Sequence, residues 1–228
     1  MMLVSISFAV GLAAAALLIP LLVRTFIDPP FRLWPTPGPG TWQNRVFWPS
    51  FRALNTLAVV TALVEREQLL GLPLGVRVLA LVLVVGLALI YGIGMLVLGR
   101  SNTYCGQDGL VARGVYRWTR NPQYAAAIPM FASLALAADN TPTYVLCAAL
   151  IAVYWLMALV EEPWLEAAYG ADYRRYCRRV PRFFNWRRGF VLGQAVVRQV
   201  QRSAPLRLVG QMLGNTQLLS TGSGRKRF

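Results

Sequence analysis

Two polar stretches of this chain carry residue types that could bind a ligand or take part in chemistry. The first runs from Arg113 to Tyr124 and is rich in arginine and aromatic residues. The second begins with the adjacent carboxylates Glu161-Glu162 and continues through several tyrosines and arginines to Pro181. Mostly apolar sequence separates the two stretches. We predict that they come together in space and enclose a pocket.

The two adjacent carboxylates need partners, because ionised groups at the end of an apolar helix are costly when unpaired. Neighbouring residues on a helix point about 100° apart, so Glu161 and Glu162 cannot both grip the same atom. One of them could hold a ligand's ammonium group or ribose hydroxyls while the other pairs with an arginine such as Arg120 or Arg174. A purely structural network of glutamates and arginines explains the pair equally well.

The sequence Arg120-Asn121-Pro122-Gln123-Tyr124 has the pattern of a helix start. Proline lacks a backbone N–H, but in the first turn of a helix that group would have no intrahelical acceptor, so no hydrogen bond is lost. Asn121 just before it is a favourable N-cap. The positive end of the helix would then favour a carboxylate or another anion nearby. Many helices begin in this way, so the motif alone is a weak indication of function.

The residues that the sequence lacks also restrict the chemistry. The chain has no histidine, which excludes a histidine-based triad, a histidine metal site and histidine-ligated haem. The three cysteines, Cys105, Cys147 and Cys177, are too widely spaced for a zinc site or a disulfide framework, so we predict no metal. Any chemistry must therefore use carboxylates, arginines, tyrosines, backbone groups or a cofactor.

The composition indicates an integral membrane protein. Hydrophobic residues make up 56% of the 228 residues and charged residues only 14%, whereas a soluble domain has about a quarter charged residues. The apolar residues occur in long blocks, as in membrane-spanning helices. The net charge of +14 is almost entirely arginine next to these blocks, which indicates contact with lipid headgroups rather than with nucleic acid.

The apolar blocks predict an all-α, multi-pass membrane bundle of about five transmembrane helices. We expect the first to be a retained span, since a secretory signal would begin with positive charge. Val46–Pro49 would extend the second span, and Asp139-Asn140-Thr141-Pro142 is a strong turn signal between the last two. The predicted spans are Leu3–Val23, Phe51–Val64, Val76–Leu98, Gln123–Ala138 and Thr143–Val160.

With five spans, every large arginine cluster falls on one side of the membrane, as the positive-inside rule requires. The N-terminus is then outside, and the C-terminus and the pocket face the cytoplasm, in what we expect to be a bacterial inner membrane. We expect the proline-rich loop Asp28–Pro49 to exclude a regular helix and to anchor Trp34, Trp42 and Trp48 among the headgroups.

We divide the chain into three parts. Residues 1–98 hold three spans and the Pro/Trp-rich loop, and residues 99–186 hold the two polar stretches and the helical hairpin. Residues 187–228 form a basic tail, in which the spacing of Leu192, Val196 and Val200 indicates an interfacial helix before an end that we expect to be disordered.

Together these motifs resemble the integral-membrane methyltransferases of the isoprenylcysteine carboxyl methyltransferase and phospholipid N-methyltransferase group. In that family Gly-x-Tyr-x-x-x-Arg-His-Pro-x-Tyr precedes a helical hairpin, and a Glu-Glu pair, a tyrosine-rich segment and Val-Pro-Arg follow. The counterparts, over roughly Tyr91 to Arg182, are Gly92-Ile93-Gly94, Gly114, Tyr116, Arg120-Asn121-Pro122-Gln123-Tyr124, Glu161-Glu162, Leu165, Tyr169-Gly170, Tyr173, Tyr176 and Val180-Pro181-Arg182.

The resemblance implies S-adenosylmethionine as the methyl donor. Methyl transfer from a sulfonium requires alignment and exclusion of water more than proton transfer, which suits a site without histidine. The family's usual histidine is Asn121 here, which cannot act as a general base. Glu162 and Arg174 are the catalytic candidates, and the cofactor-binding candidates are Gly92, Gly94, Tyr116, Arg120, Asn121, Tyr124, Glu161 and Glu162.

The methyl acceptor is expected to be a membrane-dissolved molecule: an isoprenoid carboxylate, a lipid amine or a small thiol. Arg52 and Asn55 interrupt the second span and are substrate-binding candidates from their location alone. For Arg52, a side chain that reaches the headgroups without binding substrate is an equally good interpretation. The sequence gives no basis for predicting an oligomeric state.

Two other functions stay open. Sterol reductases, which use NADPH, resemble the C-terminal half of this chain, including its Tyr-Gly and Val-Pro segments, but they usually have more spans. A non-catalytic membrane protein on the same scaffold would use its arginines only to bind anionic lipid. The Glu161-Glu162 pair and the number of spans favour the methyltransferase.

Overall fold

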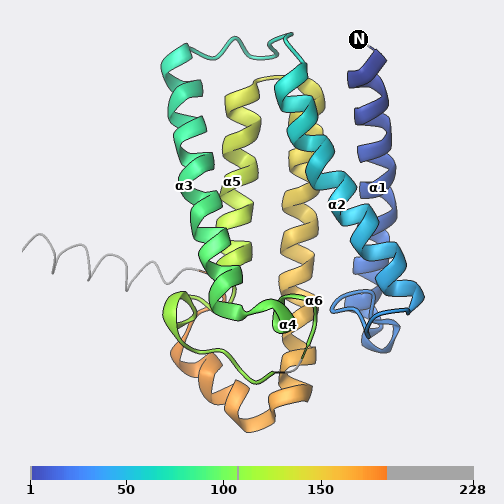
Figure 1. Ribbon diagram of the computed structural model, residues 1–228, viewed down its shortest axis with the longest axis vertical. Coiled ribbons are helices and arrows are strands. Elements are labelled where there is room, and N and C mark those ends of the chain that lie inside the picture. Colours follow the sequence, from blue (N-terminus) through green and yellow to red (C-terminus); the bar gives the residue numbers. More distant parts are fainter. Residues whose placement is uncertain (1, 107, 184–228) are drawn as a thin grey trace, which may run out of the picture. The chain divides into compact units, whose positions relative to one another are not determined.

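A computed structural model describes residues 2–106 and 108–183, and these residues form helices and connecting loops without strands. The long helices are α1 (Met2–Ile27), α2 (Trp42–Val64), α3 (Leu74–Leu98), α5 (Pro122–Ala138) and α6 (Thr141–Arg179) (Figure 1). Short helical turns connect them: η1 (Pro29–Phe31), α4 (Arg100–Thr103) and η2 (Gly114–Arg117). The prediction of an all-α membrane bundle is confirmed. The predicted tail helix lies outside the described residues.

Four of the helices, α1, α2, α3 and α6, are long and apolar enough to cross a membrane. The fifth predicted span corresponds to α5, an apolar helix of 17 residues that is shorter than a usual span. It nevertheless packs between α3 and α6 (Figure 1), where it is covered by protein on both sides. Helix α3 buries only Ala80 and Gly94, so most of its surface is free to face lipid.

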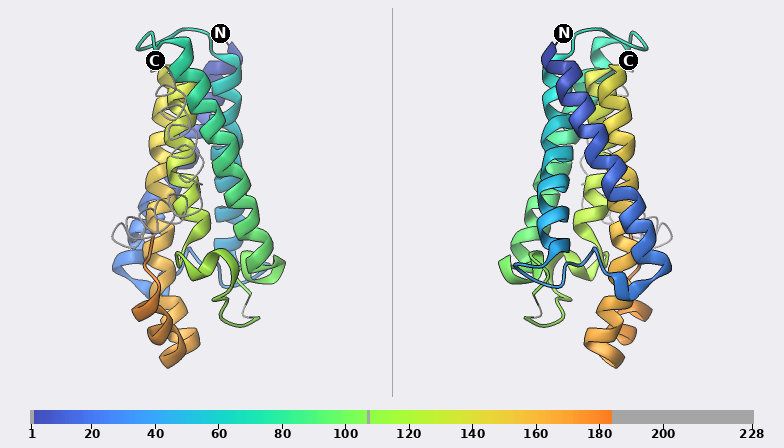
Figure 2. Two further views of the ribbon diagram at one scale, coloured as in Figure 1. Left: turned by 90° about the vertical axis from the view of Figure 1, so that its left-hand side faces the viewer. Right: turned by 90° about the vertical axis from the view of Figure 1, so that its right-hand side faces the viewer.

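The helices pack around an apolar core that extends along α1, α2, α5 and α6. Leu18, Leu22, Phe47, Leu146 and Leu150 are completely buried in it. Helices α1 and α6 approach closely at Gly11, where an added Cβ would lie 2.9 Å from the Leu146 side chain. A side chain at Gly11 would therefore separate the two helices. Figure 2 shows α1 crossing the bundle on the side away from α3.

Two boundaries differ from the prediction by more than one and a half helical turns, and the others differ by a few residues. Helix α2 begins at Trp42, inside the stretch Asp28–Pro49 predicted as loop, because the Thr41 hydroxyl caps it by accepting from the Asn44 N–H at 3.3 Å. Helix α6 continues past Val160 to Arg179 and is interrupted at Gly170, with φ 51° and ψ −121°. Only glycine adopts this backbone conformation readily, so the polar end of α6 turns away at this residue.

One end of the bundle holds the α5–α6 turn, and we call it the Asp139 end. The Asp139 carboxylate accepts from the N–H groups of Leu70, at 3.1 Å, and Leu72, at 2.8 Å. The Leu69 N–H donates to the Asp139 carbonyl at 2.7 Å. The Arg77 Nε donates to the Ala137 carbonyl at 3.0 Å. These bonds hold the α2–α3 loop against the turn that the sequence predicts.

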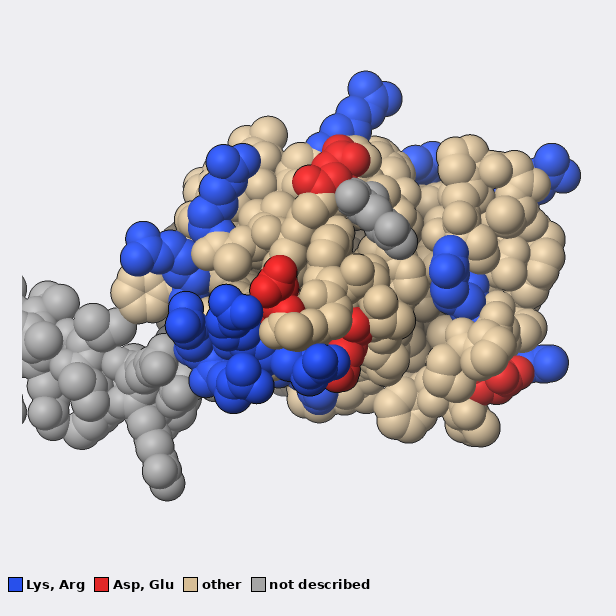
Figure 3. All heavy atoms as spheres, turned by 90° about the horizontal axis from the view of Figure 1, so that it is seen from below, with Lys and Arg blue, Asp and Glu red and all other residues tan. Residues whose placement is uncertain are grey.

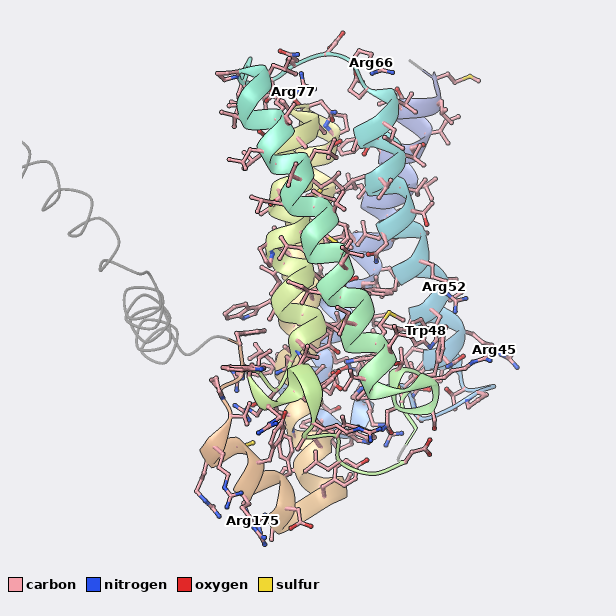
Figure 4. All side chains as sticks on the ribbon, turned by 60° about the vertical axis from the view of Figure 1, so that its left-hand side comes forward. Arg45, Trp48, Arg52, Arg66, Arg77 and Arg175 are labelled. Atoms are coloured by element: carbon pink, nitrogen blue, oxygen red, sulfur yellow. The ribbon has the colours of Figure 1, made fainter. Side chains whose placement is uncertain are left out.

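The opposite end, which we call the Glu161 end, holds the loop after α1, the segment from α3 to α5 and the last part of α6 (Figure 1). Arg66 and Arg77 lie at the Asp139 end, whereas Arg45, Arg52 and Arg175 lie toward the Glu161 end (Figure 4). Seen from this end, basic side chains surround the few acidic ones (Figure 3). Most arginines of the described segments are on this side, and the spans alternate between the two ends as predicted.

Candidate cofactor site

The two polar stretches meet at the Glu161 end, as the sequence analysis predicts. The Arg120 N–H donates to the Pro181 carbonyl at 2.9 Å, and the Thr119 hydroxyl donates to the Arg182 carbonyl at 2.9 Å. The Tyr176 hydroxyl donates to the Tyr116 carbonyl at 2.6 Å. Backbone groups are thus the main acceptors, and they fix the segment before α5 to the end of α6.

A cavity of about 610 Å³, counted with its open mouth, lies between these segments. Its walls combine aromatic rings with polar groups from α5, α6 and the segment between α3 and α5. They include Tyr116, Arg120, Gln123, Tyr124, Glu161 and Tyr173.

Glu161 lines this cavity and is held by two donors from distant parts of the chain. Its Oε2 atom accepts from the Tyr124 hydroxyl and from the Trp34 indole N–H, the latter at 3.3 Å. Trp34 lies in the loop after α1, and its side chain is only 6% exposed. The prediction that Trp34 anchors the protein among lipid headgroups is therefore wrong for this tryptophan. It is a buried partner of Glu161.

Glu162 has a different environment from its neighbour. Arg182 donates to both of its oxygens, at 2.8 and 2.6 Å, and Arg120 lies 3.3 Å from Oε1. The Glu162 side chain is 15% exposed, and it is absent from the residues that line the cavity. The two glutamates therefore have different surroundings: Glu161 lines the cavity, and Glu162 is shared by two arginines beside it.

Arg174 does not lie beside Glu161 and Glu162, where it was expected. Its guanidinium lies 3.3 Å from Glu166, and both side chains are more than half exposed. It lies beyond the break at Gly170, where the chain turns away from the start of the polar segment. Of the two arginines expected as partners of the glutamates, Arg120 pairs with Glu162 and Arg174 does not, and Arg182 is the second partner. Arg174 therefore lies apart from Glu162 and from the cavity wall, and its catalytic role stays a prediction.

Asn121 lies at the N-cap position of α5, but its side chain makes no capping hydrogen bond. Its amide instead donates to the Arg182 carbonyl at 3.2 Å, and the residue is 7% exposed. Asn121 is thus the N-cap residue, as predicted, but its side chain is turned so that the amide N–H donates to Arg182 and its oxygen does not cap the helix. Asn121 still lines the cavity, so it remains among the residues that could contact a cofactor.

The two glycines of α3 have different surroundings. A Cβ added at Gly94 would lie 3.1 Å from the Gln123 side chain, so this glycine permits close packing of α3 on the start of α5. At Gly92 nothing lies within 4 Å of an added Cβ. Neither glycine lines the Glu161 cavity. For Gly94 the geometry thus supports helix packing, the usual role of glycine in membrane helices.

A second hollow of about 500 Å³ extends from Glu161 toward the middle of the bundle. It shares Gln123, Tyr124 and Glu161 with the first cavity, and most of its other walls are aromatic. Trp34, Trp48, Phe51, Tyr91, Tyr104 and Tyr154 contribute to these walls. Aromatic faces next to a carboxylate make a favourable environment for a cation.

The two substrate-binding candidates lie beside this hollow rather than in its wall. The Asn55 oxygen accepts from the Tyr154 hydroxyl at 3.0 Å, and the Asn55 amide donates to the Phe51 carbonyl at 2.7 Å. Asn55 thus fixes an aromatic wall residue. Arg52 is exposed, and its guanidinium lies 5.4 Å from the Trp48 ring on the outer side of α2 (Figure 4).

Two buried N–H groups on residues of the cavity wall have no hydrogen-bond partner within the described residues. These groups are Arg120 Nε and Gln123 Nε2. Buried donors are nearly always paired in proteins, so unpaired donors on residues that line a cavity indicate a ligand with acceptor groups. Burial also raises the pKa of Tyr116, and the Glu161 charge raises it further, so the phenol stays protonated and can donate.

Cys105 lies in the segment between α3 and α5, close to the same cavity. Burial raises the pKa of its thiol to about 11, although a hydrogen bond with Thr36 opposes this. A thiol with this pKa is protonated at neutral pH and is a poor nucleophile. Cys105 is therefore a packing residue between the α1–α2 loop and the segment after α3.

The fold and the site together define a membrane-embedded helical protein with a polar, aromatic cavity at one end of its bundle. Residues 76–172 match the family model described as phospholipid methyltransferase. The match includes α3, α5, and α6 as far as Asp172, and it confirms the family resemblance inferred from the motifs. No curated protein and no solved structure matches the chain.

Proposed function

We propose that this protein is a membrane methyltransferase that transfers a methyl group from S-adenosylmethionine to a membrane-dissolved acceptor. The observation that carries the proposal is the environment of Glu161. This carboxylate lies at the junction of two hollows, one lined by unpaired donors and the other by aromatic rings. The family match over residues 76–172 supports the same reaction class.

The residues present fit the chemical groups of this cofactor. A sulfonium cation would be stabilised by the Glu161 carboxylate and by the aromatic faces of Tyr124 and Tyr154. The unpaired N–H groups of Arg120 and Gln123 would donate to its carboxylate or to ribose and adenine acceptors. We therefore assign cofactor binding to Tyr116, Arg120, Asn121, Tyr124 and Glu161, all of which line the cavity.

S-adenosylmethionine supplies an electrophilic methyl group with a neutral leaving group. The protein must therefore align the acceptor and exclude water. Tyr124 and Trp34 fix the orientation of Glu161, and the paired arginines fix Glu162 beside it. We now assign Glu162 a positioning role, because both of its oxygens are occupied by Arg120 and Arg182.

The arginine distribution supports an orientation with the Glu161 end at the cytoplasm. A soluble cofactor could then enter from the cytosol, while the acceptor enters from the lipid. We propose the bacterial inner membrane as the location. The acceptor classes are an isoprenoid carboxylate, a lipid amine and a small thiol, and Asn55 would act on them by fixing Tyr154.

Ligand-induced thermal stabilisation tests this function. S-adenosylhomocysteine should raise the melting temperature of the detergent-solubilised protein, and NADPH should not. At 100 times the Kd, a ligand adds about 2.7 kcal/mol to the free energy of unfolding. Glu161→Gln should abolish the shift, whereas Glu166→Gln, a matched change of an exposed glutamate on the same helix, should keep it.

A shift with NADPH instead would indicate a reductase. The absence of a shift with either ligand would indicate a non-catalytic protein. An equal S-adenosylhomocysteine shift in the Glu161→Gln variant would place the cofactor elsewhere.

A further inference from the structure

A third hollow, of about 1110 Å³ with its mouth, lies between the end of α1, the loop after it and α6 just beyond Val160. It shares Trp34 with the aromatic hollow and Trp164 with the Glu161 cavity. These two tryptophans therefore separate it from the candidate cofactor site. Nothing in the proposed cofactor binding uses this space.

Among residues 2–106 and 108–183, Arg32 supplies the one charged side chain in the lining of this hollow. Its Nε is buried without a hydrogen-bond partner, and within residues 2–106 and 108–183 Arg32 makes no ion pair. None of the described residues in the lining is a carboxylate that could neutralise the guanidinium. A buried N–H of a cation without an acceptor indicates that an anionic partner belongs here.

The backbone holds Arg32 in an unusual conformation. Its φ of 44° and ψ of 64° lie in the left-handed region, which residues with a side chain seldom adopt. The next residue is fixed, because the Leu33 N–H donates to the Thr25 hydroxyl at 3.0 Å. That hydroxyl in turn donates to the Leu21 carbonyl at 2.9 Å. Helix α1 thus constrains the loop that presents Arg32.

The other walls of this hollow are apolar. Phe26, Val160, Pro163 and Trp164 contribute hydrocarbon and aromatic surface. Phe26 is 55% exposed at the end of α1, a membrane-spanning helix, so the apolar surface continues outward toward lipid. A guanidinium at one side and a hydrocarbon surface leading to the bilayer suit a molecule with an anionic head and an apolar chain.

We infer that this hollow binds an anionic amphiphile from the membrane, with its phosphate or carboxylate at Arg32. The shared walls Trp34 and Trp164 place this molecule next to the methyl-transfer cavity. Its assignment as the methyl acceptor rests on the proposed function. The acceptor would thus be recognised by a negative charge as well as by its apolar chain.

Binding of dodecyl phosphate to the full-length protein in dodecyl maltoside tests the site. It should raise the melting temperature of the wild type, and inorganic phosphate at the same concentrations should not. Arg32→Gln should require at least tenfold more dodecyl phosphate for the same shift. Arg45→Gln, a change at an exposed arginine outside the hollow, should behave as the wild type (Figure 4).

A second variant separates loss of binding from loss of folding. Ala167→Trp should fill the hollow from α6 while Arg32 is unchanged, and it should also weaken the response at least tenfold. An S-adenosylhomocysteine shift of wild-type size in both variants would show that they are folded. Equal dodecyl phosphate responses in wild type and Arg32→Gln would overturn the site. Equal stabilisation by inorganic phosphate would overturn the amphiphile and leave a free-anion site.

A separate experiment tests whether the amphiphile bound at Arg32 is the methyl acceptor. In membranes that contain the protein, dodecyl phosphate should inhibit transfer of label from methyl-tritiated S-adenosylmethionine into extractable lipid. Arg32→Gln should require at least tenfold more inhibitor than Arg45→Gln. A dodecyl phosphate shift without any S-adenosylhomocysteine shift would leave the anion site standing and reject the methyltransferase. Labelling that dodecyl phosphate does not inhibit would reject the assignment as acceptor site.

Discussion

The two ends of the bundle use their polar groups in opposite ways. At the Asp139 end, one buried carboxylate accepts from two backbone N–H groups and fastens the α2–α3 loop to the α5–α6 turn. At the Glu161 end, residues that line the hollows carry unpaired donors, which belong to Arg32, Arg120 and Gln123. The Asp139 end has one unpaired buried group within the described residues, Asn140 Nδ2.

This difference indicates that the Asp139 end serves stability and that the Glu161 end serves ligand binding. Satisfied hydrogen bonds stabilise the Asp139 end and hold the helices in register. Unpaired donors at the Glu161 end lower stability, and a ligand that pairs with them recovers the loss. Changes at the Asp139 end should therefore alter stability alone, and changes near Glu161 should also alter ligand binding.

The largest expected effect concerns the two glutamates of α6 that pair with arginines. Glu162→Ala should lower the free energy of unfolding by about 3 kcal/mol, because Arg120 and Arg182 lose a shared, mostly buried partner. Glu166→Ala removes an exposed pair with Arg174 and should change it by less than about 0.5 kcal/mol. Unfolding in detergent measures both. Similar effects of the two changes would contradict the separate role of Glu162.

The Asp139 end gives the next largest effect. Asp139→Ala should lower the melting temperature by several degrees, because the N–H groups of Leu70 and Leu72 lose their acceptor. Asp172→Ala, which removes an exposed pair with Arg175, should leave it nearly unchanged. The S-adenosylhomocysteine Kd should be the same in both variants. A weaker Kd in Asp139→Ala would show that the two ends are not independent.

One tyrosine at each end of the bundle donates to a carboxylate, so removing each hydroxyl tests whether the two ends act separately. Tyr124→Phe removes a donor to Glu161 and should weaken S-adenosylhomocysteine binding about tenfold, as expected for a hydrogen bond to a charged group. Tyr144→Phe removes a donor to Asp139 at the other end and should leave the Kd unchanged. Isothermal titration would measure both constants. Unchanged affinity in Tyr124→Phe would mean that Glu161 does not need this donor.

The smallest effect is a pH dependence at the Asp139 end. Burial alone would raise the pKa of Asp139, but hydrogen bonds from Leu72, Leu70 and Tyr144, with the charge of Arg77, lower it overall. The stability from this lowered pKa is present above the unfolded value of about 3.9 and is lost as pH falls through the folded value. The melting temperature should therefore fall less below about pH 4 in Asp139→Asn than in wild type. Parallel curves would contradict this account.

The sequence was sufficient to predict the class of fold. Long apolar blocks, the turn at Asp139-Asn140 and the one-sided arginines follow from the cost of polar groups in lipid, and that cost is local to each segment. The boundaries were less predictable. A capped helix start at Thr41 and a left-handed glycine at Gly170 depend on contacts that short patterns do not reveal.

The partners within the site could be predicted only in part. The meeting of the two stretches followed from the hairpin between them, and Arg120 was one of two arginines expected beside the glutamates. Trp34 could not be predicted as a partner of Glu161, since the two residues are 127 positions apart. Its proline-rich surroundings indicated an interfacial loop. Arg182 was visible in the Val180-Pro181-Arg182 motif, but only the folded chain places it on Glu162.

Photo-cross-linking tests the central claim, that the Glu161 cavity holds the methyl donor. Ultraviolet irradiation of the solubilised protein with tritiated S-adenosylmethionine should label peptides containing residues 116–124 or 161–176. Excess S-adenosylhomocysteine should prevent the labelling, and Glu161→Gln should lose it. Label confined to the Asp139 end, or label that S-adenosylhomocysteine does not displace, would contradict the account.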